Sequence, residues 1–546
     1  MDSILNQTTF IINDYLDVIE LHLEPYDRWQ ILLATLVTCL LLSRIYRFYE
    51  DHEFTWSAIS TILFRIFIRL PYIRQMVSKE LAKADETISK KCREIYCNEK
   101  FLTNLPKNGM KPEEILKEFK NYQKLLKIDY KGGRVSGAVY SSMSPNLIDL
   151  ITKIYSETAF SNPLHPEVFP NITKMEAEII RWVINLYRGD DNCCGSLTSG
   201  GTESIVLAIK AYRDYARNVR GIRKPELVAP NTAHAAFHKA CQYFCIKFRS
   251  IPVDPVTFKA DVKAMERAVN RNTILLVGSA CGYPHGIIDD IESLAVVAYK
   301  YNIPLHVDCC LGGFLVPFVK DAGFHIDPVD FSVPGVTSIS CDTHKYGFTP
   351  KGSSIIMYSD KKYRQYQYSV YTEWPGGIYI SPTIAGSRSG ANIAACWAAL
   401  LYYGYNGYVE STRKILSVRQ KIMNGLEKID DIFVLGKPSL SVVAFGSKRF
   451  DIFRLTDLLT KKGWNINALQ FPSALHICLT MCHVIDGVAD DFIRDVRESV
   501  AICMQNPDEK TSGSGVIYGM AQQIPDRSMV SDMACQYLNS IYETTD

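Results

Sequence analysis

A histidine and a lysine follow a stretch with the pattern of a buried strand. Residues 336–343 mix β-branched and apolar side chains with small polar ones, which predicts a strand. His344 and Lys345 come next, and glycine and proline residues then mark a turn. A lysine at the end of a buried strand loses solvation, which lowers its pKa and frees its amine as a nucleophile. Such an amine can form a Schiff base with an aldehyde, although an isolated His-Lys pair more often lies on the surface.

A glycine-rich turn precedes a predicted helix and could hold an anion. Gly200, Gly201 and Thr202 stand where an apolar, alanine-bearing helical pattern begins. The first turn of a helix has free N–H groups and the positive end of the helix dipole, and glycines let the backbone approach a phosphate closely. The same pattern also suits a simple capped helix.

A predicted buried strand, residues 304–308, ends in the carboxylate of Asp308. Ligands of doubly wound sheets lie just beyond the carboxyl ends of the strands, so Asp308 is placed to meet one. A helix cap or a turn residue is the alternative interpretation. His234 stands at another predicted helix start, after a short strand at 227–229.

Three further segments carry polar side chains in loops. Tyr140 lies in a glycine-rich loop, and His165 lies in the rigid turn Asn162-Pro163-Leu164-His165-Pro166. By themselves a packing tyrosine and an ordinary loop histidine explain both. Residues 376–390 are too rich in small and hydroxylated side chains for a core element and predict a binding loop.

The elements that must position these residues alternate along the chain. Strands and helices alternate from 227 to 311, which predicts a mostly parallel α/β sheet. From about residue 417, short strands and helices predict a smaller α+β domain. We expect the following divisions: 1–28 before an anchor, 29–44 the anchor, 45–126 a helical linker, 127–416 the large domain, 417–504 the small domain, and 505–546 a partly ordered tail.

Composition excludes several classes of function. The 546 residues carry 60 Lys+Arg and 58 Asp+Glu, a net charge of +2, so nothing in the overall charge points to nucleic acid. The 16 cysteines include neighbours such as Cys193-Cys194 that cannot easily form a disulfide framework, which favours reduced, cytosolic thiols. No CxxC pairs repeat at zinc spacing, and we predict no metal site.

An uncharged run near the N-terminus predicts a membrane anchor. Residues 29–42 contain no charge, and Ser43 with a snorkelling Arg44 bring the run near the lower limit for a span. The preceding flank is acidic and the following one basic, which places the body in the cytosol and residues 1–28 in the lumen. A buried core helix or a signal-peptide segment is the alternative. Residues 56–79 form a basic amphipathic stretch that fits a membrane face and a linker helix about equally.

Together these features resemble the fold-type I pyridoxal-phosphate enzymes, in the group that is similar to amino-acid decarboxylases. The resemblance is closest to the sphingosine-1-phosphate lyase family, and it covers roughly residues 127–504. It rests on these segments: 136–140, 162–166, 198–204, 306–308, 342–347 and 381–387. Cys309 and Cys341 stand where that family leads us to expect alanine, and we expect these small substitutions to affect the site little.

The resemblance implies a role for each candidate residue around pyridoxal 5'-phosphate. Lys345 forms the Schiff base, Asp308 pairs with the ring nitrogen and His234 stacks on the ring. The residues implied for the cofactor phosphate are Gly200, Gly201, Thr202 and His344, and the loop with Ser387 serves the neighbouring subunit of a homodimer. Tyr140 and Lys351 are implied for proton transfer, without a division between them, and the candidates for the substrate phosphate are His165, Tyr379 and Lys351.

The activity implied is retro-aldol cleavage of a phosphorylated long-chain (sphingoid) base to a fatty aldehyde and phosphoethanolamine. An endoplasmic-reticulum membrane enzyme with a single-pass anchor and a cytosolic catalytic domain is the matching arrangement. An amino-acid decarboxylase of the same fold is the alternative, and it needs a cation for the substrate carboxylate. A catalytically inactive membrane scaffold is disfavoured because Lys345, Asp308, His234 and Tyr140 are all present.

Overall fold

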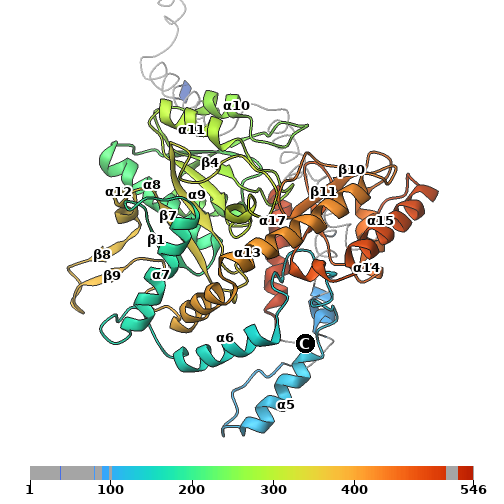
Figure 1. Ribbon diagram of the computed structural model, residues 1–546, viewed down its shortest axis with the longest axis horizontal. Helices are drawn as coiled ribbons and strands as arrows, with labels where there is room; N and C mark the ends of the chain where they lie inside the picture. The colour runs from blue at the N-terminus through green and yellow to red at the C-terminus, as the bar shows by residue number, and fades with distance from the viewer. Residues whose placement is uncertain are drawn as a thin grey trace, which may run out of the picture. The chain divides into compact units, whose positions relative to one another are not determined.

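The computed structural model describes residues 101–511 and 527–544, together with residues 37–38, 79, 86, 89–90 and 92–96 (Figure 1). The chain forms two compact units, one made of Met1–Leu125 and Met520–Asp546 and the other of Leu126–Gly519. Each unit is described by itself below.

The smaller unit contains helices α5 (Pro112–Gln123) and α17 (Arg527–Ile541). The hydroxyl of Tyr96 donates to the backbone oxygen of Ile541 at 2.9 Å, so the predicted tail includes a helix that contacts residues near the start of the chain. The predicted anchor, residues 29–44, lies outside the described residues except for positions 37 and 38. Within the part of the chain that the structure describes, no helix has both the length and the apolar character needed to cross a membrane.

The larger unit is built on a sheet of seven strands in the order β1-β7-β6-β5-β4-β2-β3. All neighbours pair in parallel except β7, which runs antiparallel to both β1 and β6. This confirms the predicted mostly parallel sheet. The strands are β1 (Cys194–Thr198), β2 (Glu226–Pro230), β3 (Lys247–Ile251), β4 (Thr273–Ser279), β5 (Leu305–Cys309), β6 (Val336–Cys341) and β7 (Ser354–Tyr358).

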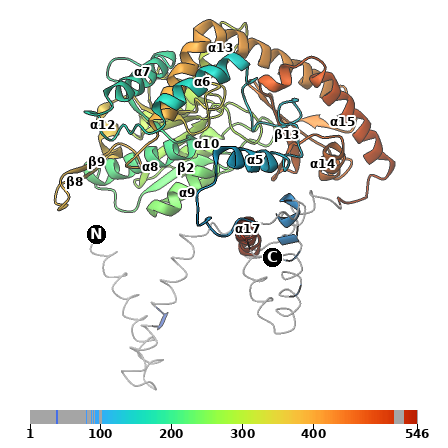
Figure 2. The same cartoon turned by 90° about the horizontal axis from the view of Figure 1, so that it is seen from below.

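Helices cover both faces of this sheet, because its strands are apolar on both sides. In β4, Leu276 packs into one core cluster and its neighbour Val277 into the other. One face is covered by α8 (Gly201–Val219) and α9 (Ala235–Phe244). The other face is covered by α7 (Pro170–Leu186), α10 (Val262–Ala268), α11 (Ile291–Lys300) and the first half of α13 (Gly390–Leu426). Figure 2 shows α7 and α13 on one side of the sheet and α8 and α9 on the other.

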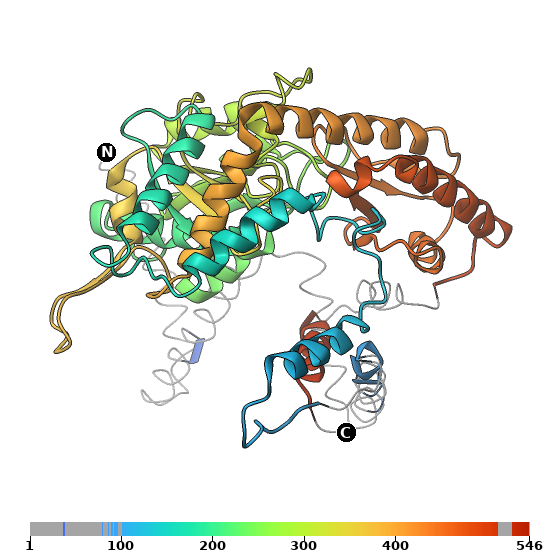
Figure 3. The same cartoon turned by 60° about the horizontal axis from the view of Figure 1, so that its bottom comes forward.

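Helix α13 continues from the sheet to a second, smaller sheet, and so passes through the predicted boundary at residues 416–417. Its backbone is non-helical at Gly404, with φ 57° and ψ −179°, and the helix bends there (Figure 3). The smaller sheet has the order β10-β11-β13-β12, all antiparallel. Its strands and helices are β10 (Phe433–Val434), β11 (Val442–Gly446), α14 (Ile452–Lys461), β12 (Asn467–Leu469), β13 (Ala474–Cys478) and α15 (Val488–Gln505).

Two remaining elements frame the functional region. Helix α6 (Pro145–Thr158) packs along α13. A hairpin of β8 (Ser369–Tyr371) and β9 (Tyr379–Ser381) projects from the body (Figure 3), with a short helix α12 (Lys361–Arg364) before it. The sequence predicted an irregular binding loop at 376–390, and the structure places the strand β9 inside it. Short 3-10 turns complete the unit at Val316–Phe318, Gln365–Gln367 and Met481–Val484.

Candidate active site

The turn after β6 is held from both sides, and this fixes the position of Lys345. The next residue, Tyr346, is fully buried and donates its hydroxyl to the backbone oxygen of Leu479 at 2.7 Å. The hydroxyl of Tyr408, from α13, donates to the backbone oxygen of Gly347 at 2.8 Å. Contacts from the smaller sheet's segment and from α13 therefore clamp the turn that carries the lysine.

The amine of Lys345 is paired with a carboxylate. Its Nζ lies 2.9 Å from Oδ2 of Asp342, whose side chain is 2% exposed. Burial alone lowers the pKa of Lys345, but the charge of Asp342 and its hydrogen bond outweigh burial, so the pKa is raised. The sequence prediction of a lowered pKa for Lys345 is therefore wrong, because it considered the loss of solvation and not the charge of Asp342.

Asp308 stands at the end of β5, beside the lysine turn. It is 6% exposed, and its Oδ1 accepts hydrogen bonds from the backbone N–H of Cys310 at 2.9 Å and the hydroxyl of Ser340 at 3.2 Å. The charge of Asp308 also contributes to the raised pKa of Lys345. Lys345 and Asp308 are thus electrostatically coupled at one edge of the sheet.

The N-terminus of α8 opens at the same edge. Gly200 is the N-cap and has no side chain to cap the helix, and Thr202 is exposed. A Cβ added to Gly201 would lie 2.7 Å from both Oδ1 of Asp342 and Sγ of Cys310, so only glycine permits this approach. The predicted anion-binding turn therefore lies against Asp342, which is also paired with Lys345.

His344 lies between this turn and Asp342. A Cβ on Gly200 would lie 3.4 Å from the imidazole ring, and Nε2 of His344 is 3.6 Å from Oδ2 of Asp342. Its Nδ1 accepts from the backbone N–H of Ser353 at 3.2 Å. Burial lowers the pKa of His344 despite the neighbouring carboxylate, so the ring is neutral near pH 7 and its Nε2 carries the proton.

Tyr140 and Lys351 meet beside the lysine turn. Nζ of Lys351 lies 4.8 Å from the centre of the Tyr140 ring, and this ring packs edge-on against Tyr346 at 4.9 Å. Burial, and then the charge of Lys345, lower the pKa of Lys351. Burial raises the pKa of Tyr140 well above its ordinary value. The structure therefore brings both proposed proton-transfer residues next to Lys345.

His234 is the N-cap of α9, and its Nδ1 accepts from the backbone N–H of Ala236 at 3.1 Å. The helix follows β2, which runs in the same direction as β5. His234 and Asp308 therefore lie at the same edge of the sheet, and His234 is exposed there.

An outer group consists of His165 and Tyr379, which were predicted for the substrate phosphate, and Ser387, which was predicted to serve the neighbouring subunit. Nδ2 of Asn162 donates to Oγ of Ser387 at 3.1 Å, which joins the turn of His165 to the loop after β9. The hydroxyl of Tyr379 lies in this loop too, where a Cβ on Gly386 would be 2.7 Å from it. His165 and Ser387 are exposed, and Tyr379 is 37% exposed.

We call the residues around the lysine turn and the start of α8 the inner group: Lys345, Asp342, Asp308, His344, Gly200, Gly201, Tyr140 and Lys351. A described link joins the outer group to this inner group. The carboxylate of Glu203, in the first turn of α8, accepts from the backbone N–H of Ile384 at 3.0 Å and from the backbone N–H of Ser199 at 2.7 Å. This single side chain ties the loop after β9 to the anion-binding turn.

Sequence reasoning did not assign roles to Asp342 or to Cys478. Asp342 precedes Lys345 by three residues, a spacing that brings the two side chains together in a helical turn, so this signal was available. Cys478, on β13, places its thiol 3.4 Å from the Tyr346 hydroxyl, and no local pattern announces that long-range contact. Among the residues with described positions, no group of His, Cys, Asp or Glu is arranged to hold a metal ion.

Comparisons with known proteins decide the family. Residues 99–448 match the model of the pyridoxal-dependent decarboxylase conserved domain. The sphingosine-1-phosphate lyase of Drosophila melanogaster is 48% identical over 518 residues, 95% of each chain, and sphingosine-1-phosphate lyase 1 of Rattus norvegicus is 47% identical over 95% of this chain and 91% of its own. The chain belongs to the sphingosine-1-phosphate lyase family.

Solved structures agree with this family assignment. The sphingosine-1-phosphate lyase of Burkholderia pseudomallei is 39% identical, with a TM-score of 0.71 over 73% of this chain and 93% of its own. The glutamate decarboxylase of Lactobacillus brevis has a TM-score of 0.64 over 74% of this chain and 95% of its own, at 21% identity, so this likeness shows the fold alone. The larger unit therefore has the fold-type I α/β architecture, and the family's cofactor is pyridoxal 5'-phosphate.

The inner group suits this cofactor. Oδ1 of Asp342 is buried and has no hydrogen-bond partner in the described structure, so it is available to a polar group of a ligand. Lys345 supplies the amine for an aldehyde, and the uncapped start of α8 supplies N–H groups for a phosphate. The amine suits the aldehyde of the cofactor, the N–H groups suit its phosphate, and the free carboxylate oxygen can accept a hydrogen bond from a polar group of its ring. All three lie in one cluster.

Replacing Asp342 by asparagine will lower the pKa of Lys345, because the amide carries no charge to stabilise the ammonium. We expect the pH dependence of pyridoxal-phosphate uptake by the apoprotein to shift toward lower pH, since the free amine is the reacting form. Absorbance of the bound cofactor against pH measures this shift. Asp289→Asn, at a buried carboxylate that accepts from the backbone N–H groups of Ala260 and Ser279, is the matched control. An unchanged profile in Asp342→Asn would show that this ion pair does not govern the amine.

Proposed function

We propose that this protein is a pyridoxal-phosphate-dependent lyase that splits sphingosine 1-phosphate and related phosphorylated long-chain bases. The products are a long-chain fatty aldehyde and phosphoethanolamine, formed by a retro-aldol break in sphingolipid catabolism. The proposal is supported by relatives with this name that match 95% of the chain. The observation that carries it is the cluster of Lys345, Asp342, Tyr140 and Lys351 at the carboxyl edge of the sheet.

Several residues of the inner group, together with His234, have tasks in holding the cofactor. Lys345 would supply the amine for its aldehyde, and Asp308 would accept from its ring nitrogen. His234 would pack on the ring, and the start of α8 with the N–H of His344 would hold the phosphate. When bound, the cofactor supplies an electron sink for the carbon–carbon break. The raised pKa of Lys345 belongs to the unbonded ammonium, which must lose its proton before it can react.

We divide the proton transfers between Lys351 and Tyr140, and the directions of their pKa shifts support this division. The pKa of Lys351 is lowered, which raises the fraction of its amine that is unprotonated at neutral pH. We therefore assign Lys351 as the base that takes the proton from the substrate's C3 hydroxyl. Tyr140 has a raised pKa, which keeps its hydroxyl protonated. We assign Tyr140 as the hydrogen-bond donor to the same C3 oxygen, which becomes the carbonyl oxygen of the aldehyde, while the proton that completes phosphoethanolamine is added at C2.

The outer group is the proposed site for the substrate phosphate. His165 and Tyr379 present an imidazole and a hydroxyl near the loop that contains Ser387. Lys351, the third residue that the resemblance implied for this phosphate, packs on Tyr140 and is assigned to proton transfer. The long alkyl chain of the substrate makes no hydrogen bonds, so the polar contacts that select the substrate are made to its head group. A decarboxylase of this fold remains the alternative, and its substrate differs by an α-carboxylate on the reacting carbon.

Lys345→Ala will abolish the visible absorbance band of the bound cofactor and reduce aldehyde release by on the order of 10³-fold or more, because the covalent attachment is lost.

Tyr140→Phe will lower kcat by roughly 10²-fold and leave the absorbance band in place, because proton transfer alone is affected. Both are measured with detergent-solubilised protein and a phosphorylated long-chain base. Lys300→Ala, at a lysine on α11, is the control. Release of carbon dioxide from an amino acid without aldehyde release would instead establish the decarboxylase.

A homodimer with shared sites is the second part of the proposal, and the β8–β9 hairpin supports it. The hairpin projects from the body and exposes apolar side chains, with Val370 61%, Ile378 72% and Ile380 61% exposed (Figure 3). Projecting apolar side chains of this kind are typical of protein interfaces. The hairpin leads directly into the loop of Ser387, so a second copy that covers the hairpin comes close to the outer group.

Ile378→Asp combined with Ile380→Asp will shift the protein from dimer to monomer, because it places two charges in the proposed interface. Size-exclusion chromatography with light scattering measures the mass. Val256→Asp, at a side chain that is 76% exposed outside the hairpin, is the matched control and leaves the mass unchanged. A double variant that stays dimeric with full activity would exclude the hairpin from the interface.

A single-pass anchor in the endoplasmic-reticulum membrane, with the catalytic units in the cytosol, is the third part. It is supported by the uncharged run 29–42 and by the charge asymmetry around it. The proposed division is 1–28 in the lumen, 29–44 in the membrane, 45–126 as linker, 127–416 and 417–504 as catalytic domains and 505–546 as tail. An alkyl substrate partitions into membranes, so an anchor keeps the enzyme where its substrate resides.

Deletion of residues 1–44 will release the protein from microsomes into the soluble fraction, whereas deletion of residues 1–28 alone will leave it bound. Membrane flotation of the two variants measures this difference. Lyase activity of the soluble variant in detergent is the control for folding. Continued flotation of the 1–44 deletion would assign membrane binding to another segment, such as 56–79.

A further inference from the structure

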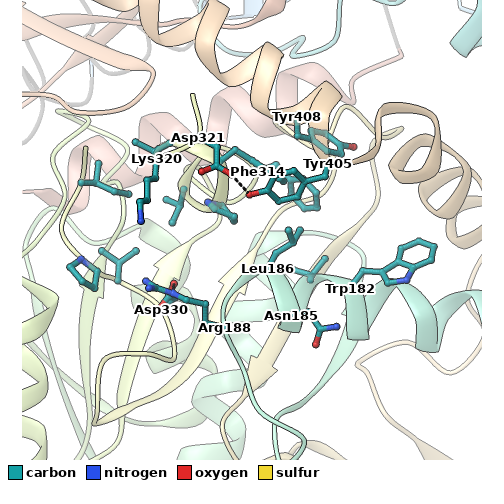
Figure 4. Close-up of a pocket in the computed structure, with 18 of the residues that line it drawn as sticks. Trp182, Asn185, Leu186, Arg188, Phe314, Lys320, Asp321, Asp330, Tyr405 and Tyr408 are labelled. Carbon is teal, nitrogen blue, oxygen red and sulfur yellow. Dashed lines mark hydrogen bonds and ion pairs between the residues drawn. The ribbon is translucent and has the colours of Figure 1, made fainter. Parts of the chain in front are cut away.

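A large pocket opens in the larger unit, and none of the residues assigned above to the cofactor or to the substrate lines it. It has a volume of about 920 Å³ and lies between α7, the segment 314–330 and α13 (Figure 4). That volume falls at the upper end of the range for ligand pockets. Its walls are rich in aromatic rings: Trp182, Phe314, Phe318, Phe324, Tyr405 and Tyr408.

The charged side chains around the pocket leave an excess of negative charge. Arg188 and Asp330 form an ion pair, Nε to Oδ2 2.7 Å, and cancel. Asp321, whose Oδ2 accepts from the Tyr405 hydroxyl at 2.7 Å, and Asp327 then face one cation, Lys320. Counted over the Asp, Lys and Arg side chains of the lining, there is one more carboxylate than cations.

The pocket shares a wall with the catalytic turn. Tyr408 lines the pocket and donates its hydroxyl to Gly347, two residues after Lys345. Its ring also stacks on Phe348 of that turn, with centres 6.0 Å apart, and on Phe318, which also lines the pocket, at 5.3 Å. A ligand that moves or stiffens Tyr408 therefore acts on the segment that positions the lysine.

We propose that this pocket is a second ligand site, for a single-chain amphiphile with an ammonium head group. The apolar walls take the alkyl chain, and removal of each CH₂ from water favours binding. The excess of carboxylates in the lining favours a cation over an anion at the head group. Long-chain amines without a phosphate group belong to this class, and the site is separate from the proposed catalytic one.

An alkyltrimethylammonium ion is the appropriate probe, because a quaternary nitrogen cannot form a Schiff base with the cofactor. Decyl- and dodecyltrimethylammonium, kept below their micelle concentrations, are titrated into the full-length holoprotein by calorimetry. We expect one site per chain and a Kd about tenfold lower for the longer chain, from two added CH₂ groups. Dodecanoate, with the same alkyl chain length but an anionic head, will bind at least several-fold more weakly.

Two variants locate the site. Leu401, 52% exposed on the pocket wall, is replaced by tryptophan to fill the cavity, which weakens binding of both probes. Asp321→Asn keeps an acceptor for the Tyr405 hydroxyl and removes the charge, so it weakens the ammonium probe and spares dodecanoate. Val256→Trp, at an exposed position outside the pocket, is the matched control and leaves both affinities unchanged.

The same titration measures the link to the catalytic turn. Saturating probe will change kcat for the phosphorylated long-chain base in the unmodified protein, and Leu401→Trp will abolish that change. Binding without any change in kcat would overturn the link. Absence of saturable binding, binding unaffected by Leu401→Trp, or loss of the dimer in Leu401→Trp would overturn the site, the last because it identifies a second copy of the chain as the occupant.

Discussion

The structure depends on one buried ion pair, between Lys345 and Asp342. An ammonium and a carboxylate that are largely withdrawn from water are tolerated only when each compensates the other. Their pairing explains why the lysine keeps its proton in spite of burial. It also explains why the start of α8 approaches so closely, since Gly201 packs directly against the same carboxylate. The Asp342 carboxylate therefore both pairs with the reactive lysine and packs against the helix that covers the sheet.

The clamps on the lysine turn come from parts of the chain that are far apart in sequence. Tyr346 is bonded to the segment after β13, and Gly347 is bonded to Tyr408 of α13. Because the turn is short, small displacements of either partner are transmitted to the amine. This arrangement makes the position of the lysine a property of the whole larger unit rather than of a local loop.

Much of this could be predicted from the sequence, where local patterns decide the outcome. The run predicted as a strand at 304–308 forms β5, which the structure places at Leu305–Cys309, and the glycine turn before α8 was recognised from its composition. Strand β1 was missed because Cys194–Thr198 is small and polar and is stabilised by pairing with β7. The direction of the Lys345 pKa shift was predicted wrongly, because burial is visible in a sequence pattern whereas a neighbouring charge depends on geometry. Contacts such as that of Cys478 with Tyr346 depend on long-range folding and leave no local signal.

The reversed direction of β7 has a consequence for how the site is built. A parallel neighbour of β6 would require the chain to cross the sheet through a helix, and the residues after β6 would be carried away from the edge. Since β7 runs back, the connection from Cys341 to Ser354 begins and ends at one edge. Both lysines, 345 and 351, belong to this one connection. The distance between the two lysines is therefore set by the single connection between β6 and β7. It does not depend on the conformation of the outer loops.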